Sequence, residues 1–174
     1  MAAQPQPNSQ SQSQPKPKAK PIPDGYQTAT PYLVLDGAAK AIEFYRKAFD
    51  AKEILRMGGP GEKIGHAEIQ IGNSRIMLAD EFPSMGALGP KTLGGSPTSI
   101  LLYVEDVDGR FARAIAAGAK SVRPVKDQFY GDRSGTLEDP FGHVWTIATH
   151  TEDVPLDEIQ RRCEQVMKTS CAGG

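Results

Sequence analysis

The sequence has few of the residues on which several protein classes depend. Only two of its 174 residues are cysteine, Cys163 and Cys171, so we expect reduced thiols rather than a disulfide framework or a zinc site. The formal net charge is only −1 and no basic cluster occurs, which argues against a nucleic-acid partner. No segment is apolar for long enough to predict a signal peptide or a membrane span. We therefore expect a cytoplasmic protein with no membrane partner.

Common nucleotide and hydrolase motifs are also missing. The glycine-rich stretch at 58–61 is not followed by Lys-Ser or Lys-Thr at the start of a helix, so it predicts a flexible hairpin rather than a phosphate loop. No Gly-x-Ser-x-Gly elbow occurs, and none of the three histidines stands beside a Ser or Cys nucleophile with an acidic partner. The chemistry must therefore be sought in other residues.

What the sequence does contain is one structural unit written twice. Ser99 follows Thr30 by 69 positions at the start of two strand-like runs, and Val144 follows Arg75 by the same interval at the closing strands. Each copy predicts strand, helix and three further strands separated by Gly, Asn, Asp and Pro turns. We predict Asp36 and Asp106 as the helix N-caps.

The repeat predicts an α+β fold of two tandem βαβββ modules. One helix covers only one face of a four-stranded sheet, so the other face stays open, and two such sheets side by side form a cup. The expected domain covers residues 26–152, with a first module at about 28–82, a linker at 83–97 and a second module at about 98–150. The linker is interpreted as a plain connection or as a lid over the cup.

The two ends of the chain differ from this domain. Residues 1–25 are rich in Gln, Pro, Ser and Lys, a composition that predicts a disordered tail. Residues 153–174 carry the apolar stripe of a C-terminal helix, which we expect to pack on the domain or on a second subunit. The stripe consists of Leu156, Ile159, Cys163, Val166 and Met167.

The doubled pattern resembles a known superfamily. Together with Phe44-Tyr45 and the Glu138–His143 segment Glu-Asp-Pro-Phe-Gly-His, it is similar to the vicinal oxygen chelate (VOC) superfamily, which includes glyoxalase I, ring-cleaving dioxygenases, and fosfomycin and bleomycin resistance proteins. The segments at 65–72, 77–81 and 128–133 resemble its PhnB-like, glyoxalase/bleomycin resistance protein-like branch. The similarity covers residues 26–152 and implies the cupped fold.

The resemblance also implies where a metal would be held. Enzymes of the superfamily bind a divalent ion with His, Gln or Glu on the first and last strand of each module. Those places correspond here to Thr30, Met77, Ser99 and Thr146. Hydroxyl and thioether groups are poor ligands for Mn, Fe, Ni or Zn, so we expect no such metal site and no cofactor. A relocated metal on His66 and Glu68 stays an alternative.

Other polar residues are candidates for contact with a ligand. His66 and Glu68 alternate with apolar residues, which predicts that they line the cup. Glu68 must then pair with His66, with Arg75 or Arg133, with water or with a ligand. Gln128, Tyr130 and Arg133 form a loop suited to an anionic or aromatic ligand. Ser99 and Tyr103 share one strand face.

Each of these candidates also has a structural interpretation. For His66 and Glu68 the structural interpretation, a hydrogen-bonded or solvated pair, is the preferred one. Arg133 is also compatible with an ion pair to Asp132 or Glu138, and Tyr103 with the core. His143 and Trp145 are expected to be structural, Trp145 in the core.

Three functions are compatible with these observations. The first is metal-independent binding of a small, partly planar or anionic molecule in the cup. The second is a VOC-type lyase, isomerase or dioxygenase that uses a shifted metal, or His66 and Glu68 as acid and base. The third is a dimerising interaction module with a filled cup. Since two sheets in one chain need not close a cup, a homodimer is expected.

Overall fold

The computed structural model describes residues 19–171, with side chains to residue 168. The predicted tail therefore lies outside the described residues up to position 18. The first module comprises β1 (Tyr32–Leu35), α1 (Ala38–Phe49), β2 (Lys52–Gly58), β3 (Ile64–Ile71) and β4 (Ser74–Asp80). The second comprises β5 (Ser99–Tyr103), α3 (Val107–Ala116), β6 (Lys120–Asp127), β7 (Asp132–Glu138) and β8 (Val144–His150). Between and after them lie η1 (Pro83–Met85), α2 (Pro90–Leu93) and α4 (Leu156–Cys171).

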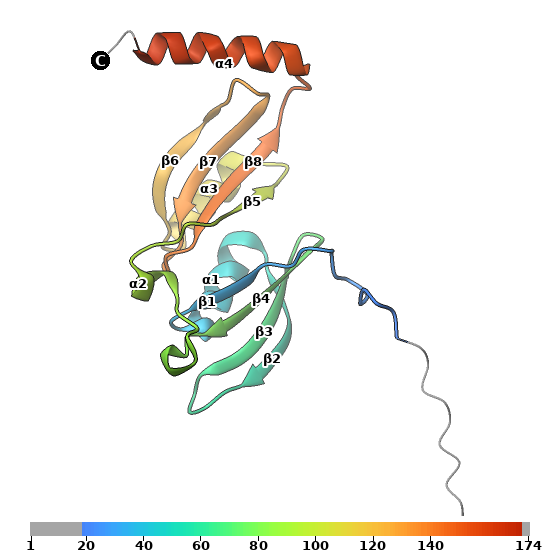
Figure 1. Cartoon of the computed structure of the whole chain (residues 1–174), viewed down its shortest axis with the longest axis vertical. Coiled ribbons are helices and arrows are strands. Elements are labelled where there is room, and N and C mark those ends of the chain that lie inside the picture. Colours follow the sequence, from blue (N-terminus) through green and yellow to red (C-terminus); the bar gives the residue numbers. More distant parts are fainter. Residues whose placement is uncertain (1–18, 172–174) are drawn as a thin grey trace, which may run out of the picture.

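The two modules have the same topology, which confirms the predicted α+β fold. Sheet 1 has the strand order β1-β4-β3-β2 and sheet 2 the order β5-β8-β7-β6. In each sheet the first and last strands of the module run parallel and the other neighbours antiparallel. The modules lie one above the other along the long axis of the molecule, with α4 at the end beyond sheet 2 (Figure 1).

The two helices begin differently. Asp106 caps α3 as predicted, since its Oδ1 accepts from the Gly109 amide at 2.9 Å. The prediction for Asp36 is wrong, because α1 begins after Gly37 and has no side-chain cap of its own. Instead Asp80 Oδ1, on β4, accepts from the amides of Gly37 and Ala38 at 2.8 and 2.9 Å. A carboxylate distant in sequence thus replaces the local cap.

A buried seam joins the modules through α1. Tyr45 and Phe49 lie against Trp145 of β8, with ring centroids 5.3 and 4.9 Å apart, and Trp145 is fully buried as predicted. Asp139 is buried in the same place and accepts from the Tyr45 hydroxyl at 2.7 Å and from Trp145 Nε1 at 2.9 Å. The main contact between the modules is that of α1 with α3. The helix sides of both sheets therefore share one core.

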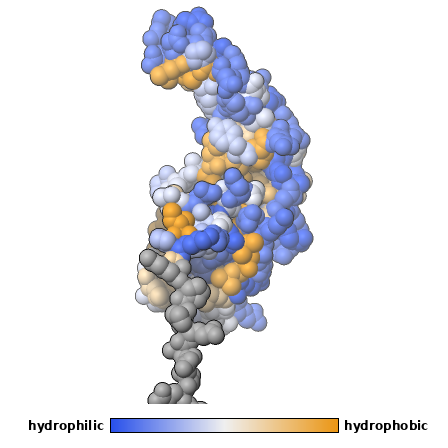
Figure 2. All heavy atoms as spheres, turned by 90° about the vertical axis from the view of Figure 1, so that its right-hand side faces the viewer, coloured by the Kyte–Doolittle hydropathy of each residue, from blue (hydrophilic) through white to orange (hydrophobic). Residues whose placement is uncertain are grey.

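The sides of the sheets away from the helices remain partly open. The two sheets are not hydrogen-bonded to each other, so one chain does not form a continuous eight-stranded cup. The linker is ordered: Glu81 accepts from the Gly89 amide and from the Thr92 hydroxyl at the start of α2. Figure 2 shows apolar surface on one side of α4, where Leu156 and Met167 are exposed. Among residues 19–171 no helix has the length and apolar character needed to cross a membrane.

Candidate functional site

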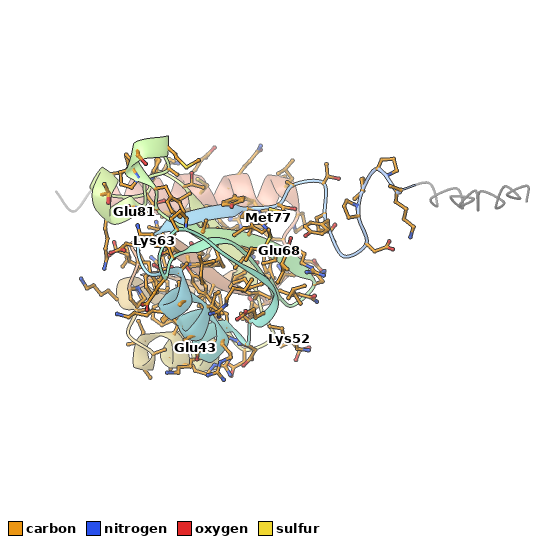
Figure 3. All side chains as sticks on the ribbon, turned by 90° about the horizontal axis from the view of Figure 1, so that it is seen from below. Glu43, Lys52, Lys63, Glu68, Met77 and Glu81 are labelled. Carbon is orange, nitrogen blue, oxygen red and sulfur yellow. The ribbon has the colours of Figure 1, made fainter. Side chains whose placement is uncertain are left out.

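Strand register brings one row of side chains together on the open face of each sheet. In sheet 1, Met77 pairs with both Tyr32 and Glu68. In sheet 2, Thr146 pairs with both Leu101 and Thr136. Figure 3 shows Glu68 and Met77 on the side of sheet 1 away from α1, which carries Glu43. The residues level with Met77 and Thr146 are therefore Tyr32 and Leu101, two positions after Thr30 and Ser99.

Sheet 1 carries a connected polar network on this face. The Tyr32 hydroxyl lies 3.0 Å from His66 Nδ1, and His66 Nε2 lies 3.4 Å from Glu68 Oε1. Arg75 Nη1 donates to Glu68 Oε2 at 3.3 Å. A neutral imidazole with its proton on Nε2 donates to the carboxylate and accepts from the Tyr32 hydroxyl. The partners of Glu68 are thus His66 and Arg75, two of those expected from the sequence.

Glu68 is held in its ionised form by these neighbours. Its pKa is lowered, chiefly because the Tyr26 hydroxyl donates a hydrogen bond to it, and further because of His66 and the charge of Arg75. The same contact raises the pKa of Tyr26. Burial of the carboxylate acts in the opposite direction and is outweighed. The network therefore presents a fixed negative charge beside a guanidinium.

Sheet 2 carries a different cluster at the far end of β5. The Tyr103 hydroxyl donates to Asp132 Oδ2 at 2.9 Å, and His150 Nδ1 lies 2.8 Å from Asp132 Oδ1. Asp132 is buried, whereas Tyr103 is 63% exposed and so does not fill the core. His150 Nε2 lies 3.0 Å from Asp153 Oδ1, and the two carboxylates raise the pKa of His150.

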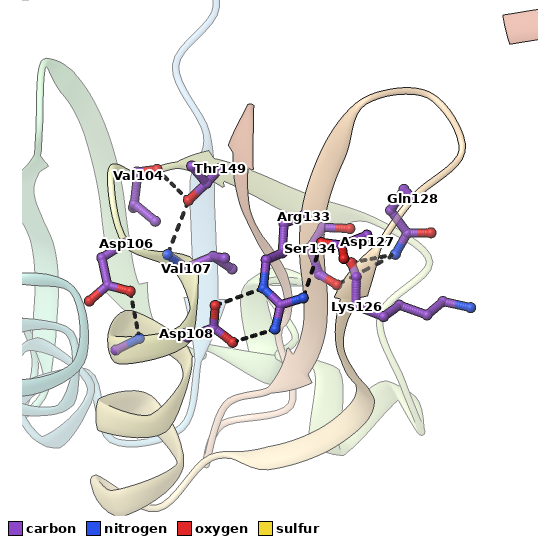
Figure 4. Close-up of polar contacts among 11 residues, drawn as sticks. Val104, Asp106, Val107, Asp108, Lys126, Asp127, Gln128, Arg133, Ser134 and Thr149 are labelled. Atoms are coloured by element: carbon purple, nitrogen blue, oxygen red, sulfur yellow. Dashed lines mark hydrogen bonds and ion pairs between the residues drawn. The ribbon is translucent and has the colours of Figure 1, made fainter. Parts of the chain in front are cut away.

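The other predicted site residues lie elsewhere on the second module. Arg133 is on the helix side of β7, where its Nε and Nη2 each donate to Asp108 at 2.7 Å and its Nη1 to Asp127 at 3.1 Å (Figure 4). These two ion pairs favour a structural role for Arg133, with partners other than those expected. Gln128 Nε2 donates to the Ser134 carbonyl at 3.4 Å, Tyr130 is 38% exposed, and Ser99 is exposed.

The open faces do not fit a transition metal. The rows that contain Met77 and Thr146 supply a phenol, a thioether, an aliphatic group and hydroxyls, with Glu68 as the one carboxylate. Among the described residues no group of three or more His, Cys, Asp or Glu is arranged to hold a metal ion. A complete set of strong ligands is thus lacking in this part of the chain.

Several members of these clusters were not predicted as site residues. Tyr26, Tyr32, Asp132 and His150 were missed, and Arg75 was considered only as a partner of Glu68. Alternation along β8 gave a usable signal for His150, since positions 146, 148 and 150 share one face. Tyr26 had no such signal, because it precedes the first strand.

Comparisons with known proteins agree with this fold. The family model described as Glyoxalase/Bleomycin resistance protein/Dioxygenase superfamily matches residues 29–147. An uncharacterised protein of Mycobacterium tuberculosis is 47% identical over 134 residues, which cover 75% of this chain and 79% of that protein.

Two solved structures illustrate the similarity in three dimensions. TioX from Micromonospora sp. ML1 is 26% identical with a TM-score of 0.57, covering 70% of this chain and 96% of that one. The fosfomycin resistance protein FosX from Listeria monocytogenes is 18% identical with a TM-score of 0.55, covering 76% and 97%, and shares the fold alone. With the repeated βαβββ topology, the matched family model shows that this chain belongs to the Glyoxalase/Bleomycin resistance protein/Dioxygenase superfamily.

Proposed function

We propose that this protein binds a small, partly planar or anionic molecule on the open face of sheet 1, without a transition metal at the superfamily positions. The observation that carries the proposal is the network of Tyr32, His66, Glu68 and Arg75 in place of a metal-ligand set. It offers a phenol ring, an imidazole and an oriented ion pair on one surface. Such convergent polar groups beside apolar surface are typical of ligand sites.

A second copy of the chain completes the site in this proposal. The open face of sheet 2 presents exposed Leu101 and Tyr103, which suit the opposite wall of a pocket. The two sheets of one chain meet through their helices, so the facing wall must come from another chain. Light scattering is expected to give twice the 18.7 kDa mass of the chain. A monomer at micromolar concentration would contradict this arrangement.

Calorimetric titration against aromatic acids, aromatic phosphates and neutral aromatics tests the binding function. Glu68→Gln and His66→Ala should each weaken binding of the best compound by roughly tenfold or more, as expected for hydrogen bonds that involve a charged group. Glu43→Gln is the matched control, because Glu43 lies on α1 at the other side of the sheet (Figure 3). Equal affinities for Glu68→Gln and Glu43→Gln would contradict the proposal.

The same network favours one alternative, acid–base catalysis. An imidazole between a phenol and a carboxylate is placed to move a proton between a bound substrate and Glu68. Loss of turnover in His66→Ala with unchanged affinity would support this reading over simple binding. Turnover that is the same in His66→Ala and the parent protein would exclude it.

A further inference from the structure

The N-terminal segment 20–28, here called the strap, lies on the open face of sheet 1. The Arg75 guanidinium lies over the Tyr26 ring, with 5.4 Å from its carbon to the ring centroid, and the Tyr26 hydroxyl interacts with Glu68. Pro21, Ile22, Pro23, Tyr26, Gln27 and Thr28 line a cavity of about 530 Å³ together with Met77. The strap therefore lies against Glu68 and Arg75, two of the four side chains that the proposed ligand would contact.

Arg75 is incompletely satisfied beneath the strap. Its Nη1 donates to Glu68, but its Nε is buried with no hydrogen-bond partner. A buried donor without an acceptor is unfavourable, and more so when it is charged. Within the described part of the chain this is the one buried side-chain nitrogen or oxygen that lacks a partner. Arg75 Nε is thus a buried, charged donor that no described protein group uses, and it is available to an acceptor that reaches it.

The strap backbone approaches Arg75 on the edge that carries this donor. A methyl group added at Gly25 would stand 3.2 Å from Nη2 and 3.5 Å from Nε of Arg75. Gly25 also has φ +85°, which a residue with a side chain rarely adopts. Glycine thus lets the chain cover the Nε–Nη2 edge, the edge on which a guanidinium receives an oxyanion through two parallel bonds.

The strap is held only loosely in this position. Ile22 is 56% exposed, the cavity beneath the strap is not filled, and the ion pair of Lys20 with Asp24 lies at the surface. Exposed pairs of this kind contribute little to stability. Its described polar contacts with the sheet are those of Tyr26, whose ring lies against Arg75 and whose hydroxyl interacts with Glu68. Displacement of the strap would therefore disrupt few contacts.

We propose that Arg75 is an oxyanion-binding residue whose Nε–Nη2 edge receives a carboxylate or phosphate group when the strap leaves the face of sheet 1. This inference rests on the proposed ligand-binding function and adds the class of ligand and the means by which its access is controlled. Glu68 stays paired with Nη1 on the other side of the guanidinium and so keeps the guanidinium group oriented. The strap backbone at Gly25 and the incoming oxyanion then exclude each other, because both need the Nε–Nη2 edge.

Calorimetric titration of the full chain with phenyl phosphate, benzoate and benzyl alcohol tests the inference. Gly25→Ala places a methyl group against Arg75 and strains the strap, so the two anions should bind at least about fivefold more tightly than to the parent protein. Gly61→Ala is the matched control, because Gly61 also has positive φ but no atom within 4 Å of an added methyl group. Comparison of the two anions tells which oxyanion is preferred.

Arg75→Lys supplies the second arm of the experiment. It keeps the charge but loses the planar fork, so anion affinity should fall roughly tenfold while benzyl alcohol is unaffected. The Nε–H resonance of Arg75, identified by its loss in Arg75→Lys, should shift when phenyl phosphate is added. Anion affinities that are equal in Gly25→Ala, Gly61→Ala and the parent protein would contradict the proposal that the strap controls access to Arg75.

The outcomes also separate this inference from the function beneath it. If compounds bind in a manner that depends on His66 and Glu68, but Arg75→Lys and Gly25→Ala change nothing, the inference fails and the binding function stands. If no probe binds to any of the proteins, both fail.

Discussion

The two modules are copies of one scaffold, yet they present different open faces. Sheet 1 has a continuous network from Tyr32 to Arg75, which meets the strap at Arg75, whereas sheet 2 exposes Tyr103 above the buried carboxylate of Asp132. Their helix-facing sides, in contrast, are similar apolar layers. Since side chains alternate between the faces of a strand, one face can conserve the fold while the other changes its chemistry.

The helix starts show the same divergence at equivalent positions. Thr149 follows Asp80 by the 69-residue repeat, and its hydroxyl accepts from the Val107 amide at the start of α3. Asp80 accepts from three amides, those of Gly37, Ala38 and Ile64. In the second module Thr149 accepts from only one amide, because Asp106 caps α3 locally. In the first module, where α1 has no side-chain cap of its own, the distant Asp80 accepts from more amides.

The largest expected effect is at Asp139, which ties the modules together. Asp139→Ala leaves the Tyr45 hydroxyl, Trp145 Nε1 and the amides of Phe141 and His143 without their acceptor. We expect urea unfolding to show a loss of roughly 3–5 kcal/mol. Tyr45→Phe removes only one donor and should cost about 1–2 kcal/mol. A loss below 1 kcal/mol for Asp139→Ala would refute this role.

An intermediate effect is expected at the two equivalent caps. Asp80→Ala should lower the free energy of unfolding by roughly 3 kcal/mol, because three amides lose a charged acceptor. Thr149→Ala should cost about 1 kcal/mol, because one amide is affected and Asp106 remains. Chemical denaturation of both variants measures the difference. Equal losses would show that the two caps did not diverge in strength.

The smallest effect is the pH dependence of the His150 cluster in sheet 2. Because its folded-state pKa is raised above about 6.5, protonated His150 contributes stability that is fully present below that pH and is lost as the pH rises through the folded pKa. His150→Gln should therefore lower the thermal midpoint at pH 5.5 and have little effect at pH 9. A constant difference between pH 5.5 and 9 would contradict the assignment.

Local sequence patterns predicted the fold but only part of the site. The 69-residue repeat, the apolar stripes and the Asp106 cap depend on neighbours within one element, and the structure agrees with them. Asp36 is the wrong cap because the carboxylate that accepts from the first amides of α1 is Asp80 on β4, which no local pattern indicates. The alternation around His66 and Glu68 placed both on the open face, as the structure has them.

The remaining site residues depend on contacts between distant segments. Tyr32 reaches His66 through the parallel pairing of β1 with β4, a register that the sequence alone does not specify. Tyr26 lies at the predicted start of the domain, before the first strand, and its position follows from Arg75 and Glu68 across the sheet. Arg133 follows Asp132 directly, so it points to the opposite side of β7 and pairs with Asp108 on α3.

The buried seam at Asp139 has a consequence for how this protein can evolve. The seam fixes the relative orientation of the modules through Tyr45, Asp139 and Trp145, none of which lies on an open face. Substitutions at Tyr32, Met77, Leu101 or Thr146 therefore leave that orientation unchanged. Selection can therefore retune what the outer surfaces recognise, one position at a time, without first finding a compensating change in the interior.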